Sequence, residues 1–367
     1  MSLPPVRVPF NMLRPLDDER TAIDAAVARV IDSGWFVLGP EVTAFEAEFA
    51  AACGAGHAVG VNTGTDALAL ALRALGVGPG DEVITSPLSA AYSALAIDMS
   101  GARPVFADID PERLTLDPEA VEAAITPRTR VLMPVHLYGQ PADLDRLGAI
   151  AARHGLAVVE DACQAHLATH RGAPLGRGSA AVAYSFYPTK NLGALGDGGA
   201  VTTDDAALAA RVKRLRNGGQ TSRYHHDERG VNSRLDELQA AVLRAKLPRL
   251  AARTAVRRRL AAAYRAALRN AAVHVPREVD AGHVYHLFPV LVDQRDRFQE
   301  HMRAAGIETL IHYPVPIPRQ PAAAGWNPAT CPRADRACAS VVSLPLYPSL
   351  SAAALADVTA AVTAFSR

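Results

Sequence analysis

The feature that most constrains the fold is a regular alternation of short apolar segments with amphipathic ones through the first two thirds of the chain. The amphipathic segments carry apolar residues three and four positions apart, as helices do, for example at 66–75, 142–154 and 206–216. Strands that alternate with helices form a mostly parallel sheet covered on both faces. The sequence therefore predicts an α/β fold with seven strands, at 58–61, 82–86, 104–108, 130–137, 157–161, 180–186 and 200–203.

The flanking segments have a different texture. Two helices are expected before the sheet, one at 17–33 and one entered through Gly39 and Pro40. A long helical stretch at 234–270 follows the sheet, and short strands with proline-rich turns come after it. We therefore expect a large domain over residues 1–245 and a smaller C-terminal α+β domain over residues 246–367.

Composition excludes several classes of protein. The 38 basic and 37 acidic residues nearly cancel, which argues against a nucleic-acid or membrane-surface partner. Apolar runs are far shorter than the roughly 20 residues of a membrane span, and the first residues lack the pattern of a signal peptide. We therefore expect a cytoplasmic globular protein. We also expect no metal site, since no CxxC spacing occurs among Cys53, Cys163, Cys331 and Cys338.

Lysine is rare in this chain. Of the 38 basic residues only Lys190, Lys213 and Lys246 are lysines. Lys213 and Lys246 lie in helical patterns, where a solvated charge is enough to explain them. Lys190 lies in a turn-rich segment that follows a strand, so it is either a solvated loop lysine or a residue that forms a Schiff base, which arginine cannot do.

Three further positions are typical of a phosphate or cofactor site. Gly64 and Thr65 follow a strand and open a helix, where free N–H groups can bind phosphate; the alternative is an ordinary threonine cap. Asp161 ends a strand, where ligands of parallel sheets gather, although turn and cap residues are also common there. Ser185 ends the strand that precedes Lys190.

These residues, taken with the motifs around them, resemble the DegT/DnrJ/EryC1/StrS family of sugar aminotransferases over residues 34–350. The matching motifs are Leu38–Val42, Gly64–Leu68, Gly80–Ile84, Glu160–His166, Ser185–Gly199, Gly230–Ala241, His312–Pro314 and Ser343–Pro345. The resemblance implies a fold-type-I, aspartate-aminotransferase-like architecture with pyridoxal 5'-phosphate as cofactor, which passes through pyridoxamine 5'-phosphate.

The resemblance also implies roles for individual residues. Lys190 bonds the cofactor as a Schiff base, Asp161 pairs with the pyridine nitrogen, and Gln164 lies near the ring hydroxyl. Gly64, Thr65 and Ser185 hold the phosphate. Asn232 reaches the phosphate from the neighbouring subunit of a homodimer with shared sites, unless it merely caps a helix near 233–234. The positions that match substrate contacts of relatives are Tyr187, Arg234, His312 and Tyr313.

Two positions depart from the family pattern. Relatives often stack an aromatic residue on the cofactor ring where this chain has Ala90, so either Tyr92 takes that role or the stacking is lost. Leu167 stands where relatives usually have glycine.

The expected activity is transfer of an amino group from L-glutamate to a keto group of a nucleotide-linked deoxysugar. We expect the keto group at C3, with dTDP ahead of UDP as the carrier. The alternatives are a 4-ketosugar or ketocyclitol aminotransferase and, in a different class, a non-catalytic sensor that retains the fold.

Overall fold

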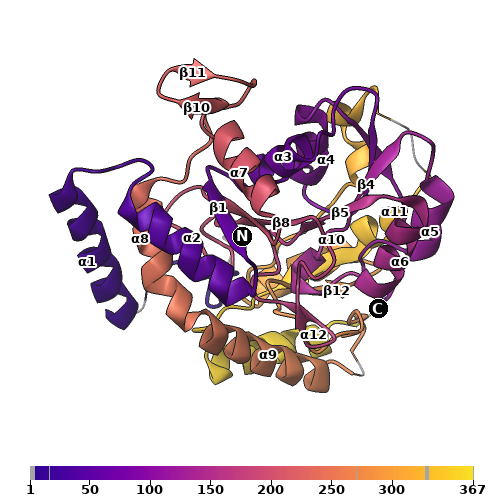
Figure 1. The fold of residues 1–367 in the computed structure, drawn as a ribbon. Helices are drawn as coiled ribbons and strands as arrows, with labels where there is room; N and C mark the ends of the chain where they lie inside the picture. Colours follow the sequence, from indigo (N-terminus) through magenta and orange to yellow (C-terminus); the bar gives the residue numbers. More distant parts are fainter. Residues whose placement is uncertain (1–4, 16, 270, 327–329, 367) are drawn as a thin grey trace.

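The computed structural model describes residues 5–15, 17–269, 271–326 and 330–366, and a single large sheet lies at its centre (Figure 1). Within the described residues this sheet has seven strands in the order β1-β9-β8-β5-β4-β2-β3, and only β9 runs antiparallel to its neighbours. The predicted fold class and all seven predicted strands are confirmed. The strands are β1 (His57–Val61), β2 (Glu82–Thr85), β3 (Arg103–Phe106), β4 (Thr129–Met133), β5 (Ala157–Asp161), β8 (Ala181–Ser185) and β9 (Gly199–Thr203).

Helices cover both faces of the sheet. The helices of the described residues are α1 (Asp17–Ser33), α2 (Pro40–Cys53), α3 (Gly64–Ala74), α4 (Tyr92–Met99), α5 (Pro118–Ala124), α6 (Leu144–His154), α7 (Ala206–Leu215), α8 (Glu237–Lys246), α9 (Leu250–Ala267), α10 (Arg295–Ala304), α11 (Pro332–Ser340) and α12 (Ala352–Ala364), of which α1 lies outside the sheet against α8. Successive strand residues point to opposite faces. In β4, Val131 and Met133 therefore pack in the core beneath α3, α4 and α7, whereas Leu132 packs with α5 and α6.

The predicted helical stretch at 234–270 is partly wrong. Residues 230–236 are not helical, because Leu235 is buried against the sheet and Asn232 bridges to Asn217. Helix α8 begins only at Glu237, and a short 3₁₀ turn at Leu247–Arg249, which contains Pro248, separates it from α9. The last predicted residue, Asn270, lies outside the described residues.

The C-terminal part has its own apolar core. The antiparallel pair β12 (Phe288–Leu291) and β13 (Val341–Leu344) packs with α9, α10 and α12 around Tyr264, Phe298 and Val358. Two small hairpins complete the chain, β6 (Thr169–His170) with β7 (Ala173–Pro174) and β10 (Gln220–Ser222) with β11 (His225–His226); the second one protrudes from the molecule (Figure 1). The expected boundary at residue 245 falls in the last turn of α8, and the division into two domains stays a prediction.

The strand directions determine where side chains can meet. Because β1 and β8 are both antiparallel to β9, they run parallel to one another and to β5. The carboxyl ends of β1, β5 and β8 therefore lie at one edge of the sheet, where ligands of such sheets bind. Gly64, Asp161 and Ser185 come from these three strand ends.

Candidate active site

Lys190 lies in the loop between β8 and β9. Its backbone N–H donates to the carbonyl of Tyr187 at 2.8 Å, which closes a turn directly after the sheet. The residue is partly exposed, but protein atoms enclose its amino group. Burial lowers the pKa of this amine, and the nearby Cys163 and Asp161 oppose that shift. Lys190 is therefore not a solvated loop lysine, because its amine is enclosed and its pKa lies below the ordinary lysine value.

Asp161 is buried at the end of β5 and held by two donors. The hydroxyl of Ser93 donates to Oδ2 at 2.7 Å, and the backbone N–H of Cys163 donates to Oδ1 at 3.1 Å. A carboxylate fixed in this way can face a cationic ring nitrogen without moving. Ser93 escaped sequence reasoning, because nothing in the pattern of α4 distinguishes it from an ordinary buried serine.

The turn after β1 provides free donors at the start of α3. Thr63 is the cap residue, and its hydroxyl accepts the N–H of Asp66 at 3.0 Å. Within the described residues the N–H groups of Gly64 and Thr65 have no hydrogen-bond partner. A Cβ on Gly64 would lie 2.7 Å from both Cys163 Sγ and Ser185 Cβ, so the turn touches the ends of β5 and β8. Thr63 is therefore the threonine cap, and the free N–H groups of Gly64 and Thr65 suit a phosphate, which stays a prediction.

Gln164 belongs to a network that connects the sheet edge to the C-terminal part. Its Oε1 accepts the backbone N–H of Tyr138 at 2.7 Å, and its Nε2 donates to the hydroxyl of Tyr313 at 3.1 Å. Burial is the main cause that raises the pKa of Tyr313 to about 12, so the phenol stays protonated. The hydroxyl of Tyr138 donates to the carbonyl of His312.

The structure brings His312 to the same region. Its Nδ1 lies 3.0 Å from the hydroxyl of Ser343, and burial together with the charge of Lys190 lowers its pKa to about 4. His312 is therefore a neutral polar group near neutral pH. Tyr187 lies at the rim with half of its surface exposed, and the Nη1 of Arg234 donates to the side chain of Asn217 at 3.3 Å. The structure itself does not test the substrate roles expected for these residues, which stay predictions.

Asn232 is exposed, and the following Ser233 lies against the turn after β1. The hydroxyl of Ser233 donates to Asp66 and accepts the N–H of Asn62. The capping alternative for Asn232 is wrong, because α8 begins at Glu237 with Asp236 in the cap position. A structure of one chain does not test the role of Asn232 in a neighbouring subunit.

Tyr92 and Leu167 belong to the two stretches in which the sequence departs from the family pattern. Tyr92 is exposed at the start of α4, next to the Ser93 that bonds Asp161, and it adds to the raised pKa of Tyr313. Leu167 has φ of +56°, a conformation that favours glycine, and its side chain packs against the core cluster that contains Ala165.

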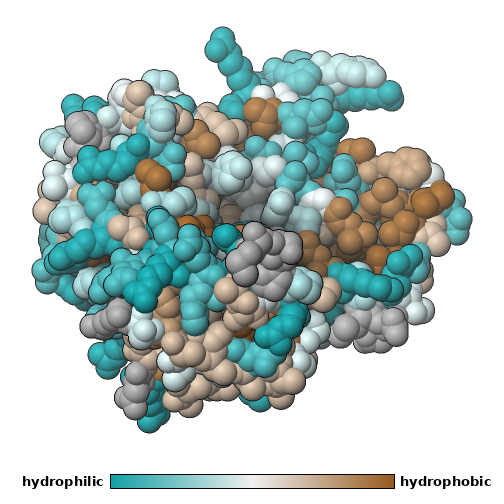
Figure 2. All heavy atoms as spheres, turned by 180° about the vertical axis from the view of Figure 1, so that it is seen from behind, coloured by the Kyte–Doolittle hydropathy of each residue, from teal (hydrophilic) through white to brown (hydrophobic). Residues whose placement is uncertain are grey.

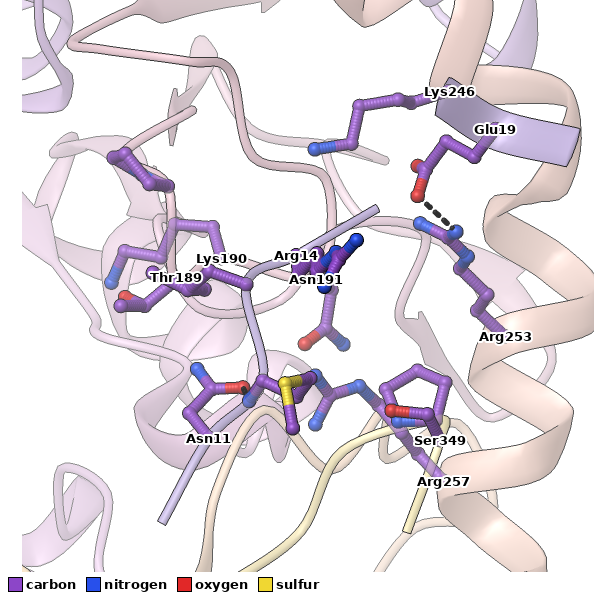
Figure 3. Close-up of a pocket in the computed structure, with 14 residues that line it drawn as sticks. Asn11, Arg14, Glu19, Thr189, Lys190, Asn191, Lys246, Arg253, Arg257 and Ser349 are labelled. Atoms are coloured by element: carbon purple, nitrogen blue, oxygen red, sulfur yellow. Dashed lines mark hydrogen bonds and ion pairs between the residues drawn. The ribbon is translucent and has the colours of Figure 1, made fainter. Parts of the chain in front are cut away.

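The expectation for Lys246 is wrong. This lysine is not a solvated surface charge: its amine donates to the carbonyl of Gly193, in the loop that carries Lys190, and burial lowers its pKa. It lines a pocket together with Arg14, Arg253 and Arg257, in which Glu19 pairs with Arg253 at 2.8 Å (Figure 3). The scarcity of lysine was the signal that could have identified it.

The residues present fit pyridoxal phosphate. Unpartnered N–H groups at the start of α3 and the hydroxyls of Thr65 and Ser185 suit a phosphate group. The enclosed amine of Lys190 and the carboxylate of Asp161 suit the aldehyde carbon and the ring nitrogen. The described part of the chain contains no helix with the length and apolar character of a membrane span. In the same residues, no group of three histidine, cysteine or acidic side chains could hold a metal ion.

Comparison with known proteins agrees with this geometry. Residues 17–363 match the DegT/DnrJ/EryC1/StrS aminotransferase family. The chain is 52% identical to dTDP-3-amino-3,4,6-trideoxy-alpha-D-glucose transaminase of Streptomyces venezuelae, covering 94% of this chain and 92% of that protein. It is 52% identical to erythromycin biosynthesis sensory transduction protein EryC1 of Saccharopolyspora erythraea, covering 97% and 99%. It is 44% identical to UDP-2-acetamido-2-deoxy-3-oxo-D-glucuronate aminotransferase of Pseudomonas aeruginosa, covering 93% and 95%.

Solved structures share the fold over nearly the whole chain. The structure of DesV from S. venezuelae superimposes with a TM-score of 0.96 at 50% identity, covering 98% of both chains. The structure of NtdA from Bacillus subtilis, which contains bound pyridoxamine phosphate, gives a TM-score of 0.91 at 31% identity, covering 97% of this chain and 84% of that one.

Proposed function

Because the chain belongs to the DegT/DnrJ/EryC1/StrS aminotransferase family, we propose that it transfers an amino group from L-glutamate to the C3 keto group of a dTDP-linked deoxysugar. The observation that carries the proposal is the enclosed amine of Lys190 beside the fixed carboxylate of Asp161. The family supports pyridoxal 5'-phosphate as the cofactor, and the B. subtilis structure with pyridoxamine phosphate supports it further.

The chain's own residues have distinct tasks in this reaction. Pyridoxal phosphate, when bound, supplies an imine-forming aldehyde and a ring that accepts electrons. Asp161 would hold a proton on the ring nitrogen by its negative charge. Lys190, with its lowered pKa, would be the base that moves a proton between the substrate carbon and the cofactor carbon. Gln164 and Tyr313 fix the edge of the site by their mutual hydrogen bond.

The names of the relatives support the choice of sugar. The S. venezuelae relative is named for a dTDP-linked sugar with its amino group at C3, and the P. aeruginosa relative is named for a UDP-linked 3-oxo sugar. The carbon is the same in both names, and the carrier of the more similar relative is dTDP. We therefore propose C3 as the position and keep dTDP ahead of UDP.

We also propose that two copies form a homodimer with shared sites. An exposed apolar group lies at the end of α1 and just after it, formed by Ile31, Trp35, Phe36 and Val37. Figure 2 shows a large hydrophobic area on the side of the molecule where α1 lies. Exposed apolar groups of this kind are typical of subunit interfaces. The cytoplasmic location stays a prediction.

The test is turnover with L-glutamate against dTDP- and UDP-linked 3-ketosugars, a dTDP-linked 4-ketosugar and a ketocyclitol. We expect amination of the dTDP-linked 3-ketosugar with the highest kcat/KM, and an NMR spectrum of the product that locates the amine at C3. Amination at C4, or of the cyclitol alone, would overturn the substrate assignment. A cofactor-loaded protein whose visible absorbance does not respond to L-glutamate would favour the alternative of a non-catalytic sensor. The relative EryC1 is named a sensory transduction protein, which supports keeping this alternative in the test.

A further inference from the structure

The loop that carries Lys190 folds back on itself tightly. A Cβ on Gly193 would lie 2.4 Å from the carbonyl oxygen of Pro188, so the two sides of the loop are in contact. The N–H of Ala194 donates to the carbonyl of Phe186 at 2.7 Å, which closes the loop at its base. The orientation of the Lys190 side chain therefore depends on how the returning side, residues 193–196, is held.

Helix α8 holds the returning side at two points. Gln239 Oε1 accepts the backbone N–H of Leu195 at 2.8 Å, and Lys246 donates to the carbonyl of Gly193. Gln239 and Lys246 are seven positions apart, which is about two helical turns, so both side chains leave the same face of α8. A third contact, from Asn191 Nδ2 to the carbonyl of Val284 at 3.0 Å, ties the other side of the loop to the C-terminal part.

The charge around Lys246 gives this contact its importance. Lys246 is partly buried. Burial is the largest cause of its lowered pKa, Glu19 opposes the shift, and Arg253 adds to it. An ammonium in such surroundings needs its acceptor, because a buried charge without a partner is costly. In Figure 3 the side chain of Lys246 points from the helix toward the loop, whereas the side chain of Lys190 points away from Lys246. Lys246 therefore acts on the backbone of the loop and not on the reacting atoms.

We propose that Gln239 and Lys246 are positioning residues, which fix the Lys190 loop to α8 and so determine where the Lys190 amine stands. The inference rests on the proposed function, because it concerns the residue that bonds the cofactor. Helix α8 is itself well anchored: Glu237, at its start, accepts the N–H groups of Gly39, Glu41 and Val42. A rigid helix with two contacts to a short loop limits the movement of the loop more than either contact alone.

The experiment compares four variants of the cofactor-loaded protein. Lys246→Met and Gln239→Met each remove one contact at similar side-chain length. Gln239→Glu keeps the oxygen that accepts the Leu195 N–H and serves as the conservative rescue. Lys213→Met is the matched control, since Lys213 lies half exposed on α7 and does not contact the loop. For each variant we measure kcat and KM for L-glutamate, thermal stability, and the pH at the midpoint of the titration of the cofactor's visible absorbance.

Both methionine variants should lose about tenfold in kcat with KM nearly unchanged, because a small displacement of the amine affects the reaction more than binding. Their absorbance midpoint should move relative to the wild type, and Gln239→Glu should restore both values. The inference is overturned if both methionine variants match Lys213→Met in kcat and in absorbance midpoint. It is also overturned if activity falls only in proportion to thermal stability while the midpoint stays constant. A wild-type protein that binds no cofactor would instead contradict the proposed function.

Discussion

Ser93 and Asp161 form a pair in which the serine hydroxyl orients the carboxylate. Asp161→Asn keeps the shape of the side chain but removes the negative charge that keeps the ring nitrogen protonated. We expect kcat to fall about 100- to 1000-fold with the fold retained.

Ser93→Ala removes one hydrogen bond to the charged carboxylate of Asp161 and should lower kcat about tenfold. Steady-state kinetics and circular dichroism check both; near-normal turnover of Asp161→Asn would contradict its role.

The lowered pKa of Lys190 predicts how the stability of the cofactor-free protein depends on pH. Between the lowered pKa and the ordinary lysine value of about 10.4, the unfolded chain binds more protons at this residue than the folded chain does. The contribution of Lys190 to the free energy of unfolding therefore rises with pH in this window. Lys190→Met should be more stable than the wild type at neutral pH, and its advantage should shrink as the pH increases. Denaturant unfolding at several pH values measures this; an advantage that grows with pH would contradict the assigned shift.

Single residues differed in how well the sequence predicted them. Lys190 was identifiable because lysine is rare in this chain and the position lacks a helical face. The same scarcity marked Lys246 as unusual, but its role and that of Ser93 depend on the approach of α8 to the loop and of α4 to β5. Such approaches come from tertiary packing, which local patterns do not contain.

At the scale of the elements, the turn from β1 into α3 allows a test of cofactor affinity. In Gly64→Ala the new Cβ would collide with Cys163 and Ser185, so the start of α3 must shift and the phosphate donors with it. Overpacking of this kind costs about 1–3 kcal/mol, and a cost of that size to the phosphate-binding conformation lowers cofactor affinity about 5- to 150-fold.

The control for this prediction is Gly148→Ala, in the interior of α6. A Cβ there has no atom within 4 Å, so the variant should gain about 0.5–1 kcal/mol of stability without any change in cofactor affinity. Fluorescence titration with pyridoxal phosphate measures both variants. Equal affinities for Gly64→Ala and Gly148→Ala would contradict a phosphate site at the start of α3.

The strands were predicted better than the helix boundaries, for a physical reason. A strand buried on both faces is apolar throughout, as in β4 and β8, and short polar turns mark its ends. Residues 234–236 were predicted to be helical but are not, because burial of Leu235 and the bridge from Asn232 to Asn217 outweigh local propensity.

At the scale of the whole molecule, the shared site of a dimer predicts complementation. A Lys190→Ala subunit and an Asn232→Ala subunit are each expected to be inactive alone. In a mixed dimer with shared sites, one site carries both defects and the other carries neither. Random re-assortment should then restore up to about a quarter of wild-type activity, because half of the dimers are mixed. Mixed dimers that form but remain inactive would show that Asn232 serves its own chain.

The most direct test of the account is to trap the cofactor on the chain by borohydride reduction and to map the labelled peptide. The account predicts a label on Lys190 alone. It also predicts that incubation with L-glutamate before reduction, without a ketosugar, removes most of the label, because the cofactor then leaves the lysine as its amine. A label on Lys213 or Lys246, or one on Lys190 that L-glutamate does not diminish, would contradict it.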